Sequence, residues 1–300
     1  MLEDSKELRV INDIILHSEN SMPEQANSDE QLIALWIYGR SRHTQRYYKS
    51  DLEKLRQFVG KALRLVILAD LQRFTDSLDE LDIVAGTKRR TLASVKSLFA
   101  FGFKLGYFPF DTARPLKVPK PKDTLTERIL SESEVQKIIA LEPCLRNQLL
   151  IRVLYASAIR VSELSSLLWS DLQAREEAGQ LTVFGKGSKT NVILIPEPLW
   201  TDLMAFRQGA ADTSPVFKSR KGGLIHPGHI LRIIKKAAIR AGITRPVSPH
   251  WFRHSHATHA IAHGADLNLV KTTLNHSSLQ TTGKYLHARP SESSSKYLTV

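Results

Sequence analysis

The chain has 300 residues, of which 42% are hydrophobic and one is a cysteine; this length favours two domains, and the apolar content is typical of globular proteins. A single cysteine excludes an internal disulfide and a thiolate metal cluster. The net charge of +12 is unevenly distributed, because residues 1–30 hold eight acidic and two basic side chains and leave +18 on the remainder. Such an excess favours a polyanionic partner. The sequence has no run of 18 apolar residues and begins unlike a secretory signal, so we expect a cytoplasmic protein without membrane contact.

The N-terminal part predicts a flexible segment followed by a helical domain. Residues 1–28 are polar and mostly acidic, and we expect them to be a loosely ordered segment. Between residues 29 and 107, apolar side chains recur at helical spacing in four successive segments, which predicts a small all-helical domain. Two of its helices carry polar and basic residues that we expect to contact phosphates, although solvated helix faces have the same composition: His43, Thr44, Arg46, Lys49, Lys88, Arg89, Arg90 and Lys96.

A proline-rich segment separates this domain from a second one. Residues 108–128 contain prolines at 109, 115, 119 and 121 and several lysines, which predicts an extended linker. The second domain, at 129–300, starts with a capping box at Ser131 and Glu134. Two β-rich runs, 181–184 and 191–195, flank a glycine-rich turn and predict a hairpin, and the chain is mostly helical from residue 227. The expected fold class is mainly α with a small antiparallel β-sheet.

A helix start near residue 248 carries two cationic side chains where an anion binds well. Ser248 is a predicted N-cap and Pro249 the first helical residue. His250 and Arg253, three residues apart, therefore lie on one face near the positive end of the helix dipole. Further histidines follow on this helix, but the pattern lacks acidic or thiolate ligands, so we expect no metal site.

Upstream of this helix, an arginine and two lysines are candidates for the same site. Arg160 and Glu163 share a helix face, a spacing that usually indicates a surface pair. Lys186, in the glycine-flanked turn of the hairpin, is suited to protonate a leaving oxygen, and Lys189 is its rival on the same turn. A solvated turn is the ordinary interpretation of both lysines.

The last two candidates lie near the C-terminus. His276 follows Asn275, which tolerates the left-handed backbone that ends a helix, and Tyr285 comes nine residues later. Taken together, the candidates comprise two guanidiniums, an ammonium, two imidazoles and a phenol. This combination suits a phosphodiester, since guanidiniums bind phosphate oxygens through forked hydrogen bonds and the phenol supplies a nucleophile.

Five ordered motifs resemble the tyrosine recombinase (phage integrase) family, most closely its Xer-like members. The resemblance covers roughly residues 29–300 and rests on Arg160–Leu164, Gly185–Gly187, His250–His254 with Ala257–His259, Leu274–Ser278 and Thr281–Tyr285. It implies a SAM-like core-binding domain at 29–107 and a catalytic domain with a C-terminal tail at 129–300. Two positions depart from the family, which commonly has glycine where Ala158 and Asn275 stand. Alanine tolerates a left-handed turn poorly, so we expect a small backbone adjustment there.

The resemblance also implies the chemistry. Tyr285 takes the position of the nucleophile, Glu163 a supporting position, and Arg160, Lys186, His250, Arg253 and His276 the assisting positions. His250 is the predicted base, and Lys186 the predicted proton donor to the 5′ oxygen. The expected activity is site-specific recombination of double-stranded DNA through a 3′-phosphotyrosyl intermediate, without metal or cofactor.

Assembly and location follow from the same resemblance. We expect a homo-tetramer in the synaptic complex, alone or with a paralogous recombinase or an accessory protein, and a nucleoid-associated location. Two alternatives remain open at this stage. One is a DNA relaxase resembling type IB topoisomerases, and the other is a non-catalytic DNA-binding protein on the same fold.

Overall fold

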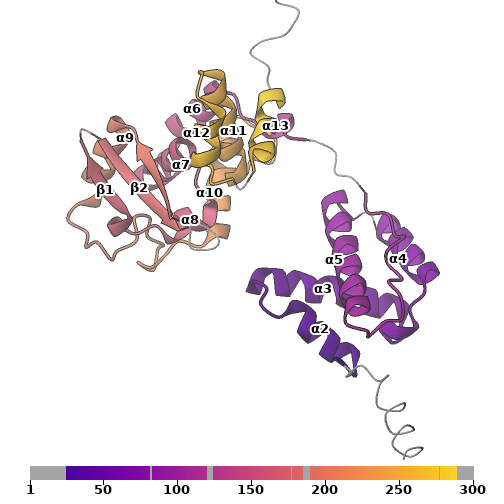
Figure 1. The fold of residues 1–300 in the computed structure, drawn as a ribbon. Helices are drawn as coiled ribbons and strands as arrows, with labels where there is room; N and C mark the ends of the chain where they lie inside the picture. The colour runs from indigo at the N-terminus through magenta and orange to yellow at the C-terminus, as the bar shows by residue number, and fades with distance from the viewer. Residues whose placement is uncertain are drawn as a thin grey trace, which may run out of the picture. The chain divides into compact units, whose positions relative to one another are not determined.

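The computed structural model describes residues 25–81, 83–119, 124–176, 178–184, 190–276 and 278–288. The chain forms two compact units, Met1–Lys122 and Asp123–Val300. Most of the acidic segment expected at residues 1–28 lies outside the described residues. Helices predominate in both units, and the C-terminal unit also carries a three-stranded antiparallel sheet (Figure 1), which confirms the predicted fold class. Within the described ranges, no helix is long and apolar enough to cross a membrane.

The N-terminal unit is a bundle of helices whose ends carry recognisable caps. Ser28 and Ser41 accept hydrogen bonds, both 3.2 Å long, from the backbone amides of Gln31 and Thr44, and Gly60 ends a helix in the left-handed conformation. The α-helices are α2 (Asp29–Ile37), α3 (Arg42–Val59), α4 (Leu68–Glu80) and α5 (Ala85–Lys104).

The core of this unit extends into the segment that the sequence predicted as a linker. Phe108, Ala113 and Leu116 are buried with the helical core, and the Phe108 ring stacks on that of Phe99, with centroids 4.8 Å apart. The prolines prevent a regular helix, but the apolar residues between them still bury their surface. Residues 108–118 therefore pack with the helices of the N-terminal unit.

A buried carboxylate ties α3 to α5 in the N-terminal unit. Asp51 is fully buried and accepts hydrogen bonds from Arg90, Thr91 (3.0 Å) and Ser94 (2.8 Å). We expect Asp51→Ala to lower the free energy of unfolding of this unit by roughly 3 kcal/mol, because three donors lose their acceptor inside the protein. Chemical denaturation followed by circular dichroism measures it. Glu30→Ala is the matched control, since Glu30 forms an exposed ion pair with Arg56, and an equal loss in both variants would contradict the prediction.

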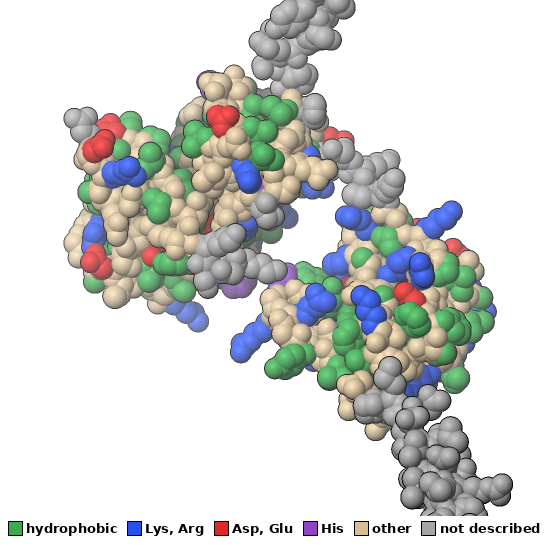
Figure 2. Space-filling model, in the orientation of Figure 1, with side chains coloured by type: hydrophobic (Ala, Val, Ile, Leu, Met, Phe, Trp, Pro, Cys, Tyr) green, Lys and Arg blue, Asp and Glu red, His purple; other side chains and the backbone are tan. Residues whose placement is uncertain are grey.

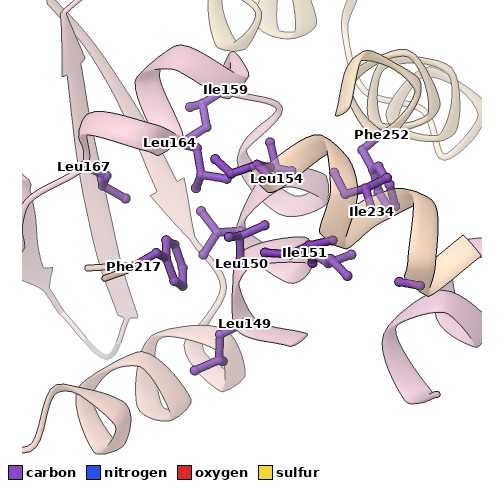
Figure 3. Packing of buried hydrophobic residues seen from close by; sticks show 14 of the residues in the cluster. Leu149, Leu150, Ile151, Leu154, Ile159, Leu164, Leu167, Phe217, Ile234 and Phe252 are labelled. Carbon is purple, nitrogen blue, oxygen red and sulfur yellow. The ribbon is translucent and has the colours of Figure 1, made fainter. Parts of the chain in front are cut away.

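The C-terminal unit packs helices around one large apolar core. Leu149, Leu150 and Ile151 of one central helix, together with Phe217 and Phe252, lie in this core (Figure 3). The α-helices are α6 (Glu132–Ala140), α7 (Leu145–Ser157), α8 (Val161–Ser166), α9 (Glu197–Arg207), α10 (Pro227–Arg240), α11 (Pro249–Ala262), α12 (Leu267–Thr273) and α13 (Leu279–Ala288).

The sheet has the order β1-β2-β3, with β1 (Leu172–Arg175), β2 (Ala178–Phe184) and β3 (Thr190–Ile195). Figure 1 shows the sheet at one side of this unit; α9 packs against β2, and α12 contacts β3. Alternate residues of β2 and β3 are buried, and Leu181 pairs with Ile193 in the register that turns both toward the core. The predicted hairpin is therefore β2 and β3. The strand β1 and the helix α9 were not predicted from the sequence.

Candidate active site

Arg253 lies at the centre of the candidate site. It projects from the second turn of α11 and is only 7% exposed. Its guanidinium donates to the carbonyl oxygens of Ala158 (2.5 Å) and Leu274. Burial, and secondarily the charge of Arg160, lower its pKa to about 10, so it remains cationic at neutral pH. The remaining donors of this guanidinium have the planar geometry that binds two phosphate oxygens.

Both carbonyls that Arg253 holds belong to turns with a left-handed residue. Ala158 follows α7 and has φ 51°, and Asn275, next to Leu274 after α12, has φ 47°. Arg160 and His276 each come two residues after one of these carbonyls. One buried arginine thus fixes the two helix ends from which the other cationic candidates project. Ala158 therefore adopts the left-handed backbone conformation, although alanine tolerates it poorly.

Ala158 offers a direct test of how much the left-handed turn costs. We expect Ala158→Gly to change the free energy of unfolding by less than about 1 kcal/mol, because relief of left-handed strain is offset by the lost buried methyl and a more flexible unfolded chain. Ala158→Val should cost more than about 2 kcal/mol, since a β-branched residue is poorly accommodated at positive φ. Thermal unfolding of the two variants measures the difference, and equal effects would show that the turn stores no strain.

Arg160 is oriented by Glu163 at the start of α8. The Glu163 carboxylate accepts from the Arg160 backbone amide (2.7 Å) and from its guanidinium (2.9 Å), so one carboxylate both caps the start of the helix and pairs with the arginine. The Arg160 side chain is 38% exposed, whereas that of Glu163 is 11% exposed. The predicted supporting residue therefore holds Arg160 in place and leaves part of its guanidinium open to a ligand.

The imidazoles of His250 and His276 flank Arg253. His250 is exposed on the first turn of α11, and its pKa is lowered by desolvation and by the charges of Arg253 and Arg160. The same causes lower the pKa of His276 to about 4. Its Nδ1 lies 2.9 Å from the hydroxyl of the buried Thr282. Both rings are therefore neutral at pH 7 and offer N–H donors rather than full charges.

Tyr285 lies in this site on α13, which packs against α11. Its side chain is 5% exposed and clusters with Ala158, Ala257, Val270 and Leu274. Its ring lies nearly parallel to that of His276, with centroids 6.4 Å apart. Burial raises the pKa of the phenol, although the charge of Arg253 acts against this. The structure therefore places the predicted nucleophile beside His276 and Arg253, and Arg160 and His250 interact electrostatically with the same Arg253. Lys186, and its rival Lys189, lie outside the described residues.

One residue of the site was missed by the sequence analysis. His254 Nδ1 lies 2.8 Å from the Tyr285 hydroxyl, whereas the predicted base His250 makes no hydrogen bond to that hydroxyl within the described part of the chain. The signal was available, because His254 follows His250 by four residues and so shares its helix face. The sequence pattern of His254, His256 and His259 was instead considered, and rejected, as a metal site.

The predicted DNA-contact residues of the N-terminal unit differ in accessibility. His43, Arg46, Lys49 and Arg89 are exposed, and Thr44 is half-buried. Figure 2 shows Lys and Arg side chains spread over the visible face of this unit. The others bind within the unit: Lys88 is buried and pairs with Asp79, Arg90 pairs with Asp51, and the Lys96 ammonium donates to the carbonyls of Arg114 and Leu116.

Comparison with known proteins agrees with this fold. Residues 128–292 match the phage integrase family, and residues 31–104 match the phage integrase N-terminal SAM-like domain. The chain is 31% identical to the tyrosine recombinase XerD of Vibrio cholerae, over 90% of this chain and 94% of that protein. It is also 31% identical to XerC of Myxococcus xanthus, over 82% and 87% respectively.

Solved structures share the fold at lower identity. A lambda integrase dimer bound to a COC′ core site has a TM-score of 0.72 at 17% identity, covering 95% of this chain and 86% of that one. XerH bound to its palindromic difH substrate has a TM-score of 0.70 at 22% identity, covering 88% and 82%. With a catalytic-domain match over more than half of its length, and a buried arginine and tyrosine where the motifs predict them, the chain belongs to the phage integrase family, the tyrosine recombinases.

Proposed function

We propose that the protein is a site-specific DNA recombinase in which Tyr285 attacks a scissile phosphate and forms a 3′-phosphotyrosyl intermediate with release of a 5′-hydroxyl. The observation that carries the proposal is the position of the Tyr285 phenol, which packs with Ala158 and Leu274, the two residues whose carbonyls Arg253 holds. Arg160 and His276 follow these two residues in the chain. The Tyr285 phenol can serve as a nucleophile, and the Arg253 guanidinium beside it can bind the phosphate that the phenol attacks.

Each assisting residue has a proposed role. Arg160 and Arg253 hold the non-bridging oxygens of the phosphate, and His276 donates an N–H to the same oxygens. Loss of one such donor typically costs about 10²- to 10³-fold in rate. His250 stands on the first turn of α11, next to this phosphate position, where the sequence predicted a base. Lys186 is proposed, from the resemblance alone, to protonate the departing 5′ oxygen. These side chains supply the charge neutralisation, so the proposed reaction uses neither metal nor cofactor.

The proposed partner is double-stranded DNA, bound by four copies of the chain on two sites. Both domains of the integrase fold are present, and a lambda integrase of the same fold (TM-score 0.69, 15% identity) forms a tetramer on a Holliday junction. His43, Arg46, Lys49 and Arg89 are exposed on the N-terminal unit and are the proposed phosphate contacts there. Because the substrate is DNA, we propose a nucleoid-associated, cytoplasmic location. A paralogous recombinase or an accessory protein remains a proposed participant.

Trapping on nicked suicide duplexes tests the proposal. Cleavage releases a short 5′-hydroxyl fragment that diffuses away, so the protein stays attached to the 3′ end and appears as a shifted band in a denaturing gel. A second assay with two differently labelled duplexes then separates recombination from relaxation, because a relaxase never joins strands from different molecules. Adducts without joined products would favour the relaxase, and binding without adducts would favour a non-catalytic protein. Because the relatives are Xer-type recombinases, we expect both adducts and joined products.

A further inference from the structure

His254 makes the closest polar contact with the predicted nucleophile. Its Nδ1 lies 2.8 Å from the Tyr285 hydroxyl, and the two rings have centroids 5.7 Å apart. The phenol is 5% exposed, and within the described residues its hydroxyl has no other hydrogen-bond partner. A proton leaving this hydroxyl therefore has one direct acceptor.

The protonation states of the two groups favour an acceptor role for His254. Burial lowers the pKa of His254 to about 4, and His250, Arg128, Arg253 and His276, the groups that face it, act in the same direction. The pKa of the Tyr285 phenol is raised. At neutral pH the imidazole is therefore neutral and the phenol protonated, and the tautomer with hydrogen on Nε2 accepts the phenol's hydrogen bond at Nδ1.

Binding of the substrate changes the proton affinity of His254. The scissile phosphate brings negative charge to Arg160 and Arg253, and so offsets the positive charges that disfavour protonation of His254. The free protein thus holds the nucleophile docked and protonated. The bound phosphate makes His254 a better acceptor when the phenol attacks.

We propose that His254 orients the Tyr285 hydroxyl and accepts its proton during strand cleavage, a step that rests on the proposed recombinase function. As the phenolic oxygen forms its bond to phosphorus, the bond from phosphorus to the 5′ oxygen breaks, and the phenol's proton moves to His254 Nδ1. The departing 5′ oxygen takes up a proton, the role proposed above for Lys186. When a 5′-hydroxyl later attacks the phosphotyrosine, it returns that proton to the same acid, and the imidazolium returns its own proton to the departing phenolate. Protons and bonds balance over the cycle without a further reactant.

The test measures single-turnover adduct formation by full-length His254→Gln on suicide duplexes. Glutamine keeps a hydrogen-bonding side chain but cannot take a proton, so we expect the rate to fall about 10²-fold or more while DNA affinity stays within about threefold. His263→Gln is the matched control, because His263 is exposed at the end of the same helix and pairs with Glu132. This control should cleave at the wild-type rate.

Two readouts distinguish proton transfer from a structural role. In the wild type the rate should fall as the pH is lowered from the ordinary histidine range near 6.5 toward about 4, because protonated His254 accepts nothing. In His254→Gln this fall in rate at low pH should disappear, although His250 and His276 still titrate. A duplex with sulfur at the bridging 5′ position has a leaving group that needs no proton, so it should not rescue the variant. A fluorinated, more acidic tyrosine at position 285 should rescue it in part.

Each outcome decides the inference. A His254→Gln rate within threefold of wild type, an unchanged pH profile, or full rescue by the bridging sulfur overturns it, even if the variant also unfolds more easily. These results would leave the recombinase function intact as long as the wild type forms the Tyr285 adduct. If the wild type itself forms no adduct on any duplex that it binds, the proposed function fails, and the inference fails with it.

Discussion

Tyr285→Phe is expected to abolish the covalent protein–DNA adduct while DNA binding stays within about threefold of wild type. Phenylalanine fills the same pocket beside Ala158, Val270 and Leu274, so the fold and the phosphate-binding residues remain. It lacks the oxygen that attacks phosphorus, and no neighbouring side chain takes its place. We expect a fall of at least about 10⁴-fold in adduct formation, comparable with losing the nucleophile in other covalent enzymes.

Tyr155→Phe is the control for this substitution. Tyr155 is also a partly buried tyrosine of the C-terminal unit, and its hydroxyl lies 2.8 Å from His259 Nδ1. Its loss removes one internal hydrogen bond, worth about 1 kcal/mol, and should leave the adduct in place. Denaturing gels of both variants with the same suicide duplex measure the outcome. Persistence of the adduct in Tyr285→Phe would refute the nucleophile assignment.

The sequence predicts most of this architecture because its elements carry strong local signals. The helical spacing of Leu32, Trp36, Leu92 and Phe99 predicts the N-terminal bundle, and the capping box at Ser131 marks the start of α6. Among the described motif residues, Arg160, His250, His276 and Tyr285 all interact electrostatically with Arg253. Their convergence was predicted from the resemblance, since no local pattern brings Arg160 and Tyr285 together across 125 positions.

The features that the sequence did not predict depend on tertiary contacts. The helix α9 begins in a proline-flanked segment and β1 has only four residues, so neither has a clear period. Phe108 and Leu116 lie between prolines, and their burial depends on a core made by distant helices. Lys88 looked like a surface cation, yet it pairs with Asp79 of the preceding helix. The partnership between His254 and Tyr285 also depends on the packing of α13 on α11.

Arg253→Lys is expected to lower both activity and stability, and this double loss distinguishes Arg253 from Arg160. Lysine keeps the charge but not the fork, so it cannot hold the carbonyls of Ala158 and Leu274 together and still reach a phosphate. We expect single-turnover cleavage to fall about 10²- to 10³-fold. The free energy of unfolding should fall by about 1–3 kcal/mol, because a buried carbonyl is left without its donor.

Arg160→Lys is the matched comparison, because the Arg160 side chain is 38% exposed and pairs only with Glu163 among the described residues. It should lose a similar factor in cleavage with little change in thermal unfolding. Equal stability of the two variants would show that the carbonyl contacts of Arg253 are incidental. If Arg253→Lys alone unfolds more easily, the residue that binds the phosphate also ties together the turns preceding Arg160 and His276. The phosphate site would then be preorganised by one of its own ligands, and no conservative replacement of Arg253 could preserve the one role without the other.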